Sequence, residues 1–340
     1  MDIYDRSVTA ISSPEPIHAS ACPVCDVESV VPQFAVEGMD APIAVCEGCG
    51  LGRFSPMPSA DEVAALYPSE YYGEPGTKFR PLIEGLVRAV ATRHIGFLCR
   101  GLREGARVLD VGCGRGVILG PIADRGFEAH GVEVSADATR GADPRAQIRI
   151  AARLVDAGFE AGTFDQIVIW HVLEHLPDPR GTLEECHRIL APGGRLIVAV
   201  PNFSSWQARW SGPGWFHLDA PRHLYQFPLL ALRALMERSG FECESDHHFS
   251  LRQNPFGWIQ SAQNRFDPVH PNRLYTALHH PRQLDGASLA GWLGAWLWLA
   301  IAAIPALGLS VLEAVFRSGA TVHVVATRRA DECDSRESTS

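Results

Sequence analysis

The chain has 340 residues, of which 46% are hydrophobic and 20% are charged, and its formal net charge is −9. This length allows two domains, or one large domain with a smaller appendage, and the apolar fraction is enough for a buried core. The 39 acidic residues outnumber the 30 basic ones, which argues against a nucleic-acid-binding protein, because neutralising phosphates needs a basic surface.

The N-terminal segment is polar and contains prolines, so residues 1–20 are expected to form a flexible tail. This segment lacks the basic and apolar regions of a secretory signal. We therefore expect a cytoplasmic protein, in which disulfide bonds are uncommon.

Four of the nine cysteines form two C-x2-C pairs separated by 20 residues: Cys22, Cys25, Cys46 and Cys49. This spacing is typical of a zinc ribbon, in which four thiolates surround one Zn²⁺ and leave no position for water. Gly48 and Gly50 give the second pair the backbone freedom that its turn needs. A segment this short cannot bury a core of its own, so the zinc would be structural. The sequence predicts a zinc ribbon over residues 21–55, with four reduced cysteines as the alternative.

Residues 56–104 are expected to form a linker and helices. The linker is rich in proline and serine, and a helical pattern opens at Asp61. A second helix is predicted from Leu82 to about Arg100, because apolar residues recur there at helical spacing.

Strand and helix patterns alternate from Ala106 onwards. The predicted strands are 107–111, 129–132, 166–170, 195–200, about 242–249 and 321–327. The helices predicted between them lie near 115–125, 135–142, 182–190 and 228–239. This alternation predicts an α/β fold with a mostly parallel sheet that is covered on both faces.

The first of these strands runs into a glycine-rich turn that opens a helix. The glycines follow the pattern G-x-G-x-G at Gly112, Gly114 and Gly116, and Asp110 stands two residues before the first. Such a turn lets the backbone approach a cofactor and exposes the N–H groups of a helix start. A dinucleotide-binding turn has the pattern G-x-G-x-x-G, so a nicotinamide oxidoreductase is the less favoured interpretation.

Residues 107–116 resemble the first motif of class I S-adenosylmethionine-dependent methyltransferases, and the resemblance extends over about 105–202. Three further segments resemble later motifs of that family, in the same order along the chain. They are Glu133 at the end of the second strand, residues 164–176 and residues 189–197. The resemblance implies a Rossmann-like methyltransferase fold with an antiparallel last strand and a core made of residues 105–250 and 319–329. It also implies S-adenosyl-L-methionine as the cofactor.

The same resemblance implies which residues bind the cofactor: Asp110, Gly112, Cys113, Gly114, Gly116, Glu133, Trp170 and His171. In the family, a carboxylate at the position of Glu133 binds both ribose hydroxyls. Arg153 stands near the position of an acid that often meets the adenine amine, so main-chain contacts of residues 152–154 are the alternative there. Pro121 falls in the helix after the turn and predicts a kink or a short helix.

A hydroxyl acceptor needs a base, and histidine is the usual one near neutral pH. His171 and His175 follow the fourth strand, at the edge where parallel sheets bind ligands. A second group, 215–225, contains His217 and His223 among aromatic and charged residues. We expect His223 to be the catalytic base, His217 to be the second choice and His175 to orient a loop. A capping or core role is the alternative for each histidine.

Segments similar to 215–225 recur in a branch of class I methyltransferases from surface-polysaccharide biosynthesis, some with a cysteine-rich N-terminal segment. Sugar C-methyltransferases share that arrangement, but they have a large additional C-terminal domain that is not recognised here. Residues 250–258 and 260–265 are rich in amides, which would either bind a polyhydroxylated acceptor or cap helices.

The stretch Leu289–Val311 contains no charged residue and has three of the eight tryptophans: Trp292, Trp296 and Trp298. It is long enough to cross a bilayer, but the strand at 321–327 must return to the sheet, so both ends must lie on one side. Pro305 predicts a break between two helices, about 287–304 and 306–317. We expect an insertion over residues 251–318 whose apolar helical hairpin dips into one leaflet. Burial in the fold or in a dimer interface is the alternative.

The sequence thus predicts an S-adenosylmethionine-dependent methyltransferase that acts on a hydroxyl of a sugar or glycolipid, as in polysaccharide biosynthesis. The alternatives are a quinone or other lipid acceptor, and a non-catalytic binding protein with the same fold. The expected partners are a small-molecule or lipid-linked sugar substrate, the membrane through 287–317, and a second copy in a homodimer, but not nucleic acid. We expect the protein at the inner face of the cell membrane, and residues 330–340 to form a disordered tail.

Overall fold

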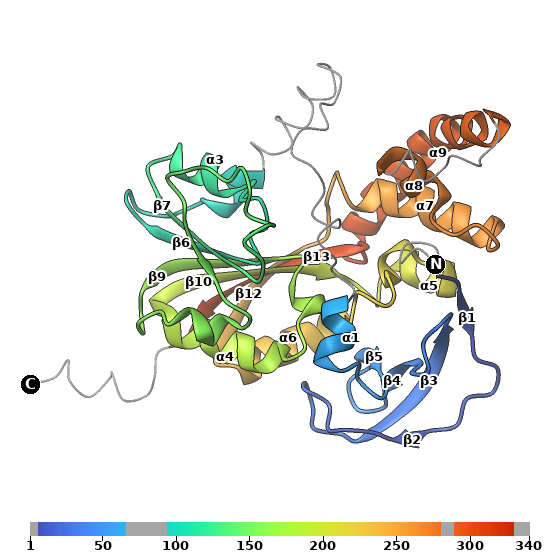
Figure 1. Ribbon diagram of the computed structural model, residues 1–340, viewed down its shortest axis with the longest axis horizontal. Coiled ribbons are helices and arrows are strands. Elements are labelled where there is room, and N and C mark those ends of the chain that lie inside the picture. The colour runs from blue at the N-terminus through green and yellow to red at the C-terminus, as the bar shows by residue number, and fades with distance from the viewer. Residues whose placement is uncertain (1–5, 66–93, 280–288, 330–340) are drawn as a thin grey trace, which may run out of the picture. The chain divides into compact units, whose positions relative to one another are not determined.

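The computed structural model describes residues 6–65, 94–279 and 289–329 (Figure 1). The chain divides into two compact units, which are described separately below. The first unit contains Met1–Leu66, Val200–Leu232 and His247–Val322. The second contains Tyr67–Ala199, Arg233–Asp246 and His323–Ser340.

The second unit is built on a seven-stranded sheet with the order β12-β13-β10-β9-β6-β7-β8. Its strands are β6 (Arg107–Val111), β7 (Glu128–Glu133), β8 (Gln147–Ile150), β9 (Phe164–Trp170), β10 (Leu190–Pro201), β12 (Phe241–His247) and β13 (Thr321–Arg328). The pairs β6–β7, β7–β8, β6–β9 and β9–β10 are parallel. The predicted mostly parallel sheet is confirmed, and the last strand takes a place inside it, between β10 and β12.

Helices flank this sheet: α3 (Leu119–Ala123), α4 (Pro179–Ile189) and α6 (Leu229–Arg238). Figure 1 shows α3 and α4 on opposite faces. Leu119 and Ile122 are buried with Val108 of β6 in one core cluster. Helix α4 starts earlier than predicted because the side chain of Asp178 accepts a hydrogen bond from the N–H of Gly181, which caps the helix.

Three local predictions can be compared with the structure. The helix with Pro121 is short, as predicted, with five residues. The helix predicted at 135–142 is wrong: this segment forms turns, and it carries Gly141, a poor helix former. The strand β8 was missed because it is an exposed edge strand without an apolar run. Of the helix predicted at 82–100, residues 94–98 are helical and residues 82–93 lie outside the described part.

The first unit contains a second, antiparallel sheet with the order β1-β3-β4-β5-β11, in which β2 also pairs with β3. Its strands are β1 (Val8–Ala10), β2 (Ile17–His18), β3 (Ser29–Val36), β4 (Ile43–Cys46), β5 (Gly52–Phe54) and β11 (Tyr225–Gln226). The flexible tail predicted for residues 1–20 is therefore wrong for β1 and β2, because both add to the edges of β3. The ribbon segment is part of a larger sheet that includes two residues from far along the chain.

Helices complete the first unit: α1 (Ala60–Ala65), α5 (Trp206–Ser211), α7 (Asn254–Phe266), α8 (Arg273–His279) and α9 (Leu289–Val315). The helical pattern predicted from Asp61 corresponds to α1, which opens on a capping box. In this box the Ser59 hydroxyl accepts from the Glu62 N–H, and the Glu62 carboxylate accepts from the Ser59 N–H.

Helix α9 contains Pro305 and continues through it for 27 residues in total. The predicted hairpin with a break at Pro305 is therefore wrong. A proline removes one N–H donor, but contacts on both sides hold this helix: Trp298 donates to the Ile259 carbonyl, and Trp258 donates to Glu313. Within α9, Trp296–Val315 is long and apolar enough to cross a membrane, with a mean hydropathy of 1.9, and 17% of it is buried.

Candidate active site

The glycine-rich turn after β6 is held against β7 and the segment after β9. The Gly112 N–H donates to the Val132 carbonyl at 2.8 Å, and its φ of 71° is a left-handed conformation that favours glycine. A Cβ atom on Gly112 would lie 2.6 Å from Val172 Cγ2. No larger residue fits at this position without moving Val172.

Glu133 ends β7 with a carboxylate that two main-chain N–H groups hold in place. Its Oε2 accepts from Gly114 at 2.9 Å, and its Oε1 accepts from Val134 at 2.7 Å. Each carboxylate oxygen has a second lone pair, so Glu133 can accept two further hydrogen bonds. The arrangement fits the implied pair of ribose hydroxyls.

Asp110 lies in β6 and is 6% exposed. Burial, with a smaller contribution from Glu133, raises the pKa of Asp110 to about 8. A cationic or hydrogen-bond-donating ligand group would compensate this buried carboxyl, and an α-amino group is such a ligand. Cys113 packs its Sγ against Gly131, and burial raises the pKa of its thiol well above the usual value. Cys113 is thus not an activated nucleophile.

Trp170 and His171 end β9. The Trp170 ring lies 3.9 Å from the His94 ring and 4.4 Å from the His323 ring, measured between centroids. His171 has a φ of 55°, and its Nδ1 lies 3.3 Å from Oε1 of the buried Glu174. The buried Nε2 of His171 has no hydrogen-bond partner in the part of the chain that the structure describes.

Glu174 was missed by sequence reasoning, although the spacing of three residues after His171 was a usable signal. A carboxylate beside Nδ1 fixes the orientation of the imidazole and favours the tautomer with its proton on Nδ1. Nε2 then carries the lone pair and can accept a proton. His175 ends the 3-10 turn Leu173–His175 directly after Glu174. These residues all belong to the second unit.

His217 and His223 are brought together in the first unit. His217 lies in the 3-10 turn Phe216–Leu218, and both side chains are buried. The Nδ1 of His223 lies 2.8 Å from the His217 carbonyl oxygen, so Nδ1 donates to it. The Nε2 of His223 lies 3.5 Å from Oδ2 of Asp219, and the other oxygen of that carboxylate, Oδ1, accepts from Arg222. Asp219 is a positioning residue for His223 that sequence reasoning did not assign.

A family profile described as "Methyltransferase domain" matches residues 83–246. This part of the chain is a methyltransferase domain. The match and the strand order of the second unit support the class I, S-adenosylmethionine-dependent type that the sequence motifs predicted.

Two curated proteins similar to this methyltransferase domain are each named "Ubiquinone biosynthesis O-methyltransferase". The protein from Alkalilimnicola ehrlichii is 35% identical over 111 residues, which cover 31% of this chain and 45% of the relative. The protein from Maricaulis maris is 29% identical over 170 residues, which cover 46% of this chain and 66% of the relative. The chain thus spans less than two thirds of the length of these relatives. A solved S-adenosylmethionine-dependent methyltransferase from Archaeoglobus fulgidus aligns with 72% of this chain and 94% of its own at 18% identity, with a TM-score of 0.45.

A pocket of about 180 Å³ lies in the first unit, beside the turn with His217. Trp215, Phe216 and Asp219 form part of its wall, together with Ser211 and Arg6. The buried Oγ of Ser211 has no hydrogen-bond partner among the described residues. Aromatic rings and polar groups thus face one cavity, as in many sites that bind small molecules.

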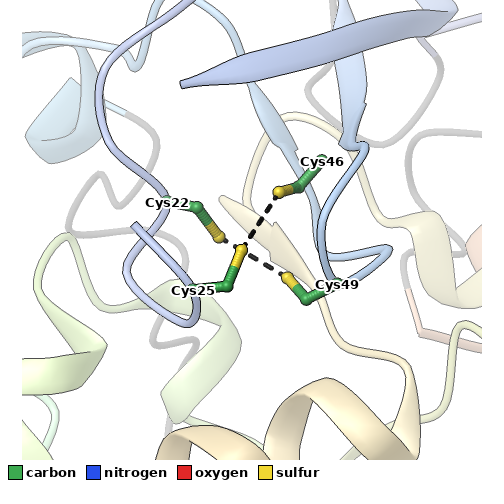
Figure 2. A group of neighbouring side chains, drawn as sticks. All are labelled: Cys22, Cys25, Cys46 and Cys49. Carbon is green, nitrogen blue, oxygen red and sulfur yellow. Dashed lines mark hydrogen bonds between the residues drawn. The ribbon is translucent and has the colours of Figure 1, made fainter. Parts of the chain in front are cut away.

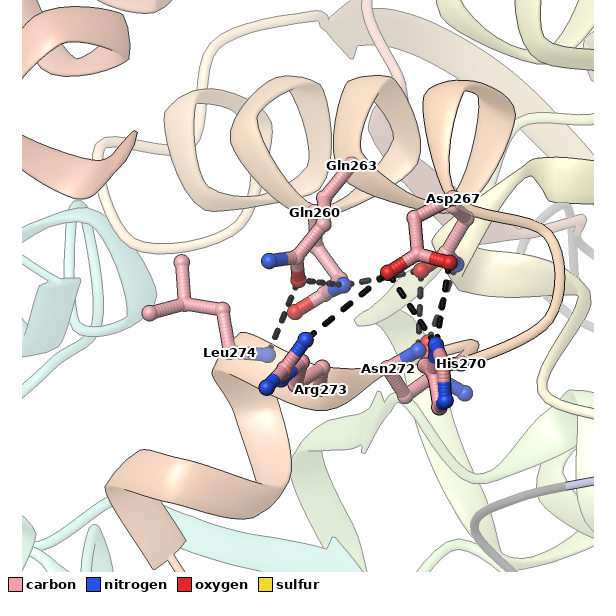
Figure 3. A network of polar contacts seen from close by, with 8 residues as sticks. Gln260, Gln263, Asp267, His270, Asn272, Arg273 and Leu274 are labelled. Carbon is pink, nitrogen blue, oxygen red and sulfur yellow. Dashed lines mark hydrogen bonds and ion pairs between the residues drawn. The ribbon is translucent and has the colours of Figure 1, made fainter. Parts of the chain in front are cut away.

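The amides of α7 cap the next helix (Figure 3). Gln260 Oε1 accepts from the Tyr275 N–H, and Gln263 Oε1 accepts from the Leu274 N–H. Asn264 accepts from the Asn272 N–H in the same way. These bonds satisfy N–H groups at the start of α8, so the helix-capping alternative accounts for these three side chains.

The four predicted metal-ligating cysteines meet in one place (Figure 2). The Sγ atoms of Cys22 and Cys49 lie 3.6 Å apart, those of Cys25 and Cys46 lie 3.5 Å apart, and all four lie within 4.8 Å of one another. Zn–S bonds of about 2.3 Å in a tetrahedron place sulfur atoms roughly 3.8 Å apart, so the geometry fits zinc.

Gly48 shows how closely this cluster is packed. A Cβ atom on Gly48 would lie 2.9 Å from the Cys25 sulfur and 2.8 Å from Val27 Cγ2. The hydrogen bond from Cys49 lowers the pKa of Cys22 to about 5. The same hydrogen bond raises the pKa of Cys49, and burial raises the pKa of Cys25, so the group favours one thiolate and a bound cation would be needed to deprotonate the others.

Proposed function

We propose that the chain is a methyltransferase that transfers a methyl group from S-adenosylmethionine to an acceptor hydroxyl. The observation that carries the proposal is the carboxylate of Glu133, held by two main-chain N–H groups beside the Gly112–Gly116 turn. A binding protein without chemistry is the alternative, and the ordered histidines with carboxylate partners argue against it.

When bound, S-adenosylmethionine would supply a methyl group on a sulfonium: the acceptor oxygen would bond to the methyl carbon in line as the C–S bond breaks, and S-adenosylhomocysteine would leave as a neutral thioether. The protein aligns the two groups and excludes water. His223 accepts the hydroxyl proton at Nε2, because its Nδ1 already donates to the His217 carbonyl. Asp219 then faces a positively charged ring and stabilises it. His217 remains the second choice for the base, and His175 a loop-orienting residue.

His171 is a further candidate for the base. Its Nδ1 is held by Glu174, and its Nε2 is buried at the carboxyl end of β9. The dyad resembles the arrangement by which a carboxylate orients an imidazole in general-base catalysis.

The acceptor class has two candidates, which share a hydroxyl. The names of the two relatives favour a quinone or other lipid acceptor, whereas the histidine-rich segment 215–225 and the N-terminal cysteines support a sugar or glycolipid of polysaccharide biosynthesis. We place the quinone or lipid acceptor first. Transfer of a tritiated methyl group to membrane-lipid, lipid-linked-sugar and nucleotide-sugar fractions separates the candidates.

Calorimetry with S-adenosylhomocysteine tests the activity independently of the acceptor. Binding is expected, with one site per chain. No binding of S-adenosylhomocysteine or S-adenosylmethionine to the zinc-loaded protein would overturn the proposal.

We also propose that Cys22, Cys25, Cys46 and Cys49 bind one structural Zn²⁺. The sulfur geometry supports the metal, and the closed set of four thiolates leaves no position for substrate. Elemental analysis should find one zinc per chain in the wild type and none in Cys46→Ser. Zinc-free wild type with unchanged thermal stability would contradict the proposal.

A last part of the proposal concerns location. We infer a cytoplasmic enzyme that works at the inner face of the cell membrane. The support is the exposed apolar helix α9, which would bring the protein to lipid-borne acceptors.

A further inference from the structure

One face of helix α9 packs against the rest of the first unit, and the other face is apolar and exposed. Large aliphatic side chains point outward at helical spacing, with exposed fractions of 62% for Leu297, 63% for Ile301, 82% for Ile304, 47% for Val311 and 70% for Val315. We call these five residues the outer stripe. A helix on the surface of a water-soluble protein usually has polar residues in such positions.

The opposite face of α9 is attached to α7 at points before and after Pro305. Ala306, Ser310 and Glu313 on this face are buried. The Trp298 indole donates to the Ile259 carbonyl at 3.0 Å, and the Trp258 indole donates to Glu313 at 2.9 Å. Both bonds involve neighbouring residues of α7, Trp258 and Ile259, so the two parts of α9 before and after Pro305 are fixed to the same part of α7.

This attachment excludes a helix that crosses the membrane alone. If α9 spanned the bilayer, α7 would be drawn towards it as well, with the exposed charged side chain of Arg265. Buried polar groups in hydrocarbon are unfavourable, and the strand β13 follows α9 back into the sheet. Helix α9 therefore meets an apolar surface side-on.

We propose that the outer stripe of α9 inserts into one leaflet of a lipid bilayer, with the helix axis in the membrane plane. The composition of the stripe favours lipid over a second copy of the chain. Protein interfaces combine apolar residues with a polar rim, whereas every residue marked exposed in α9 from Trp296 to Val315 is apolar, so no polar rim borders the outer stripe on this helix. Trp296 near one end is 42% exposed, and Arg317 follows the other end, and both residue types favour the headgroup region.

Flotation of the full-length, zinc-loaded protein with vesicles of phosphatidylcholine and phosphatidylglycerol tests this. The wild type should float with the vesicles, and 0.5 M salt should leave most of it bound, because the contact is mainly apolar. The double variant Ile301→Glu/Ile304→Glu should lose roughly 100-fold or more in vesicle affinity.

Leu230→Glu is the matched control, because Leu230 is an exposed leucine (78%) outside α9. It should float like the wild type, and all variants should bind S-adenosylhomocysteine as the wild type does. The inference rests on the membrane location proposed above and names the surface that contacts the lipid; vesicle binding needs no methyl transfer, so a failure of the proposed methyl transfer would leave this result unchanged. Wild type that stays with the soluble fraction, or a stable dimer that only the double variant dissociates, would overturn the proposal.

Discussion

At the scale of single residues, the cofactor side depends on carboxyl groups in different environments. The Glu133 carboxylate is held by main-chain donors, whereas Asp110 is buried and its pKa is raised to about 8. Both residues could be predicted from the sequence, because the motif that contains them is local. The sequence did not predict that Asp219 orients His223 or that Glu174 orients His171, because each contact depends on how a turn folds.

Replacing Glu133 by alanine should weaken S-adenosylhomocysteine binding at least tenfold, or ~1.4 kcal/mol, because the ligand loses hydrogen bonds to the carboxylate. Isothermal calorimetry measures the change. Glu128→Ala, at the exposed start of the same strand, is the control and should bind like the wild type. Equal affinities for Glu133→Ala and wild type would remove Glu133 from the site.

Replacing His223 by alanine should lower turnover by about 100-fold and leave S-adenosylhomocysteine affinity unchanged, because only proton transfer is affected. His171→Ala tests the further candidate base in the same assay, and His270→Ala, at an exposed position, is the control. If His171→Ala alone reduces turnover, the base is assigned to the wrong histidine.

The raised pKa of Asp110 predicts a pH dependence of stability without ligand. The folded state holds this proton more tightly than the unfolded state, so the contribution is present below about pH 3.8 and is lost as the pH rises to about 8. The free energy of unfolding of the wild type, relative to Asp110→Asn, should therefore fall across this range. Urea titrations at pH 4.5, 6 and 8 measure the difference, and a difference that rises with pH would refute the assignment.

At the scale of elements, strand β5 of the ribbon segment pairs with β11, which follows His223 by two residues. Tyr225 pairs with Arg53, and Gln226 pairs with Gly52. The Gln226 side chain then donates to the Leu218 carbonyl at 3.0 Å, inside the turn that carries His217 and His223. The two C-x2-C pairs could be predicted from their spacing, but this pairing across 170 residues left no periodic signal. A two-residue strand is too short for a pattern.

Replacing Gln226 by alanine should reduce kcat or raise KM for the acceptor by about tenfold, because the turn with His223 loses a side-chain anchor. Affinity for S-adenosylhomocysteine and zinc content should stay the same. Gln226→Glu, which cannot donate to the Leu218 carbonyl, should behave like the alanine variant at pH 8. Unchanged steady-state constants in both variants would show that Gln226 has no part in positioning the turn.

At the scale of the whole molecule, the sequence predicted the positions of the parallel strands β6, β7, β9 and β10, because each has an apolar run beside a glycine-rich or helical segment. It did not predict the short exposed strands β1, β2 and β8, which owe their conformation to a neighbouring strand. For α9, the proline rule indicated a break that packing against α7 overrides.

The shared sheet of the first unit has a consequence for exchanging parts between related enzymes. Residues 8–54 and 225–226 form one hydrogen-bonded structure, so the N-terminal segment and the segment 215–226 have to be transplanted together. A chimera that replaces only residues 105–199 should keep the acceptor preference of the protein that contributes both flanking parts. Substitutions that change the acceptor preference would then be expected in both stretches of sequence together.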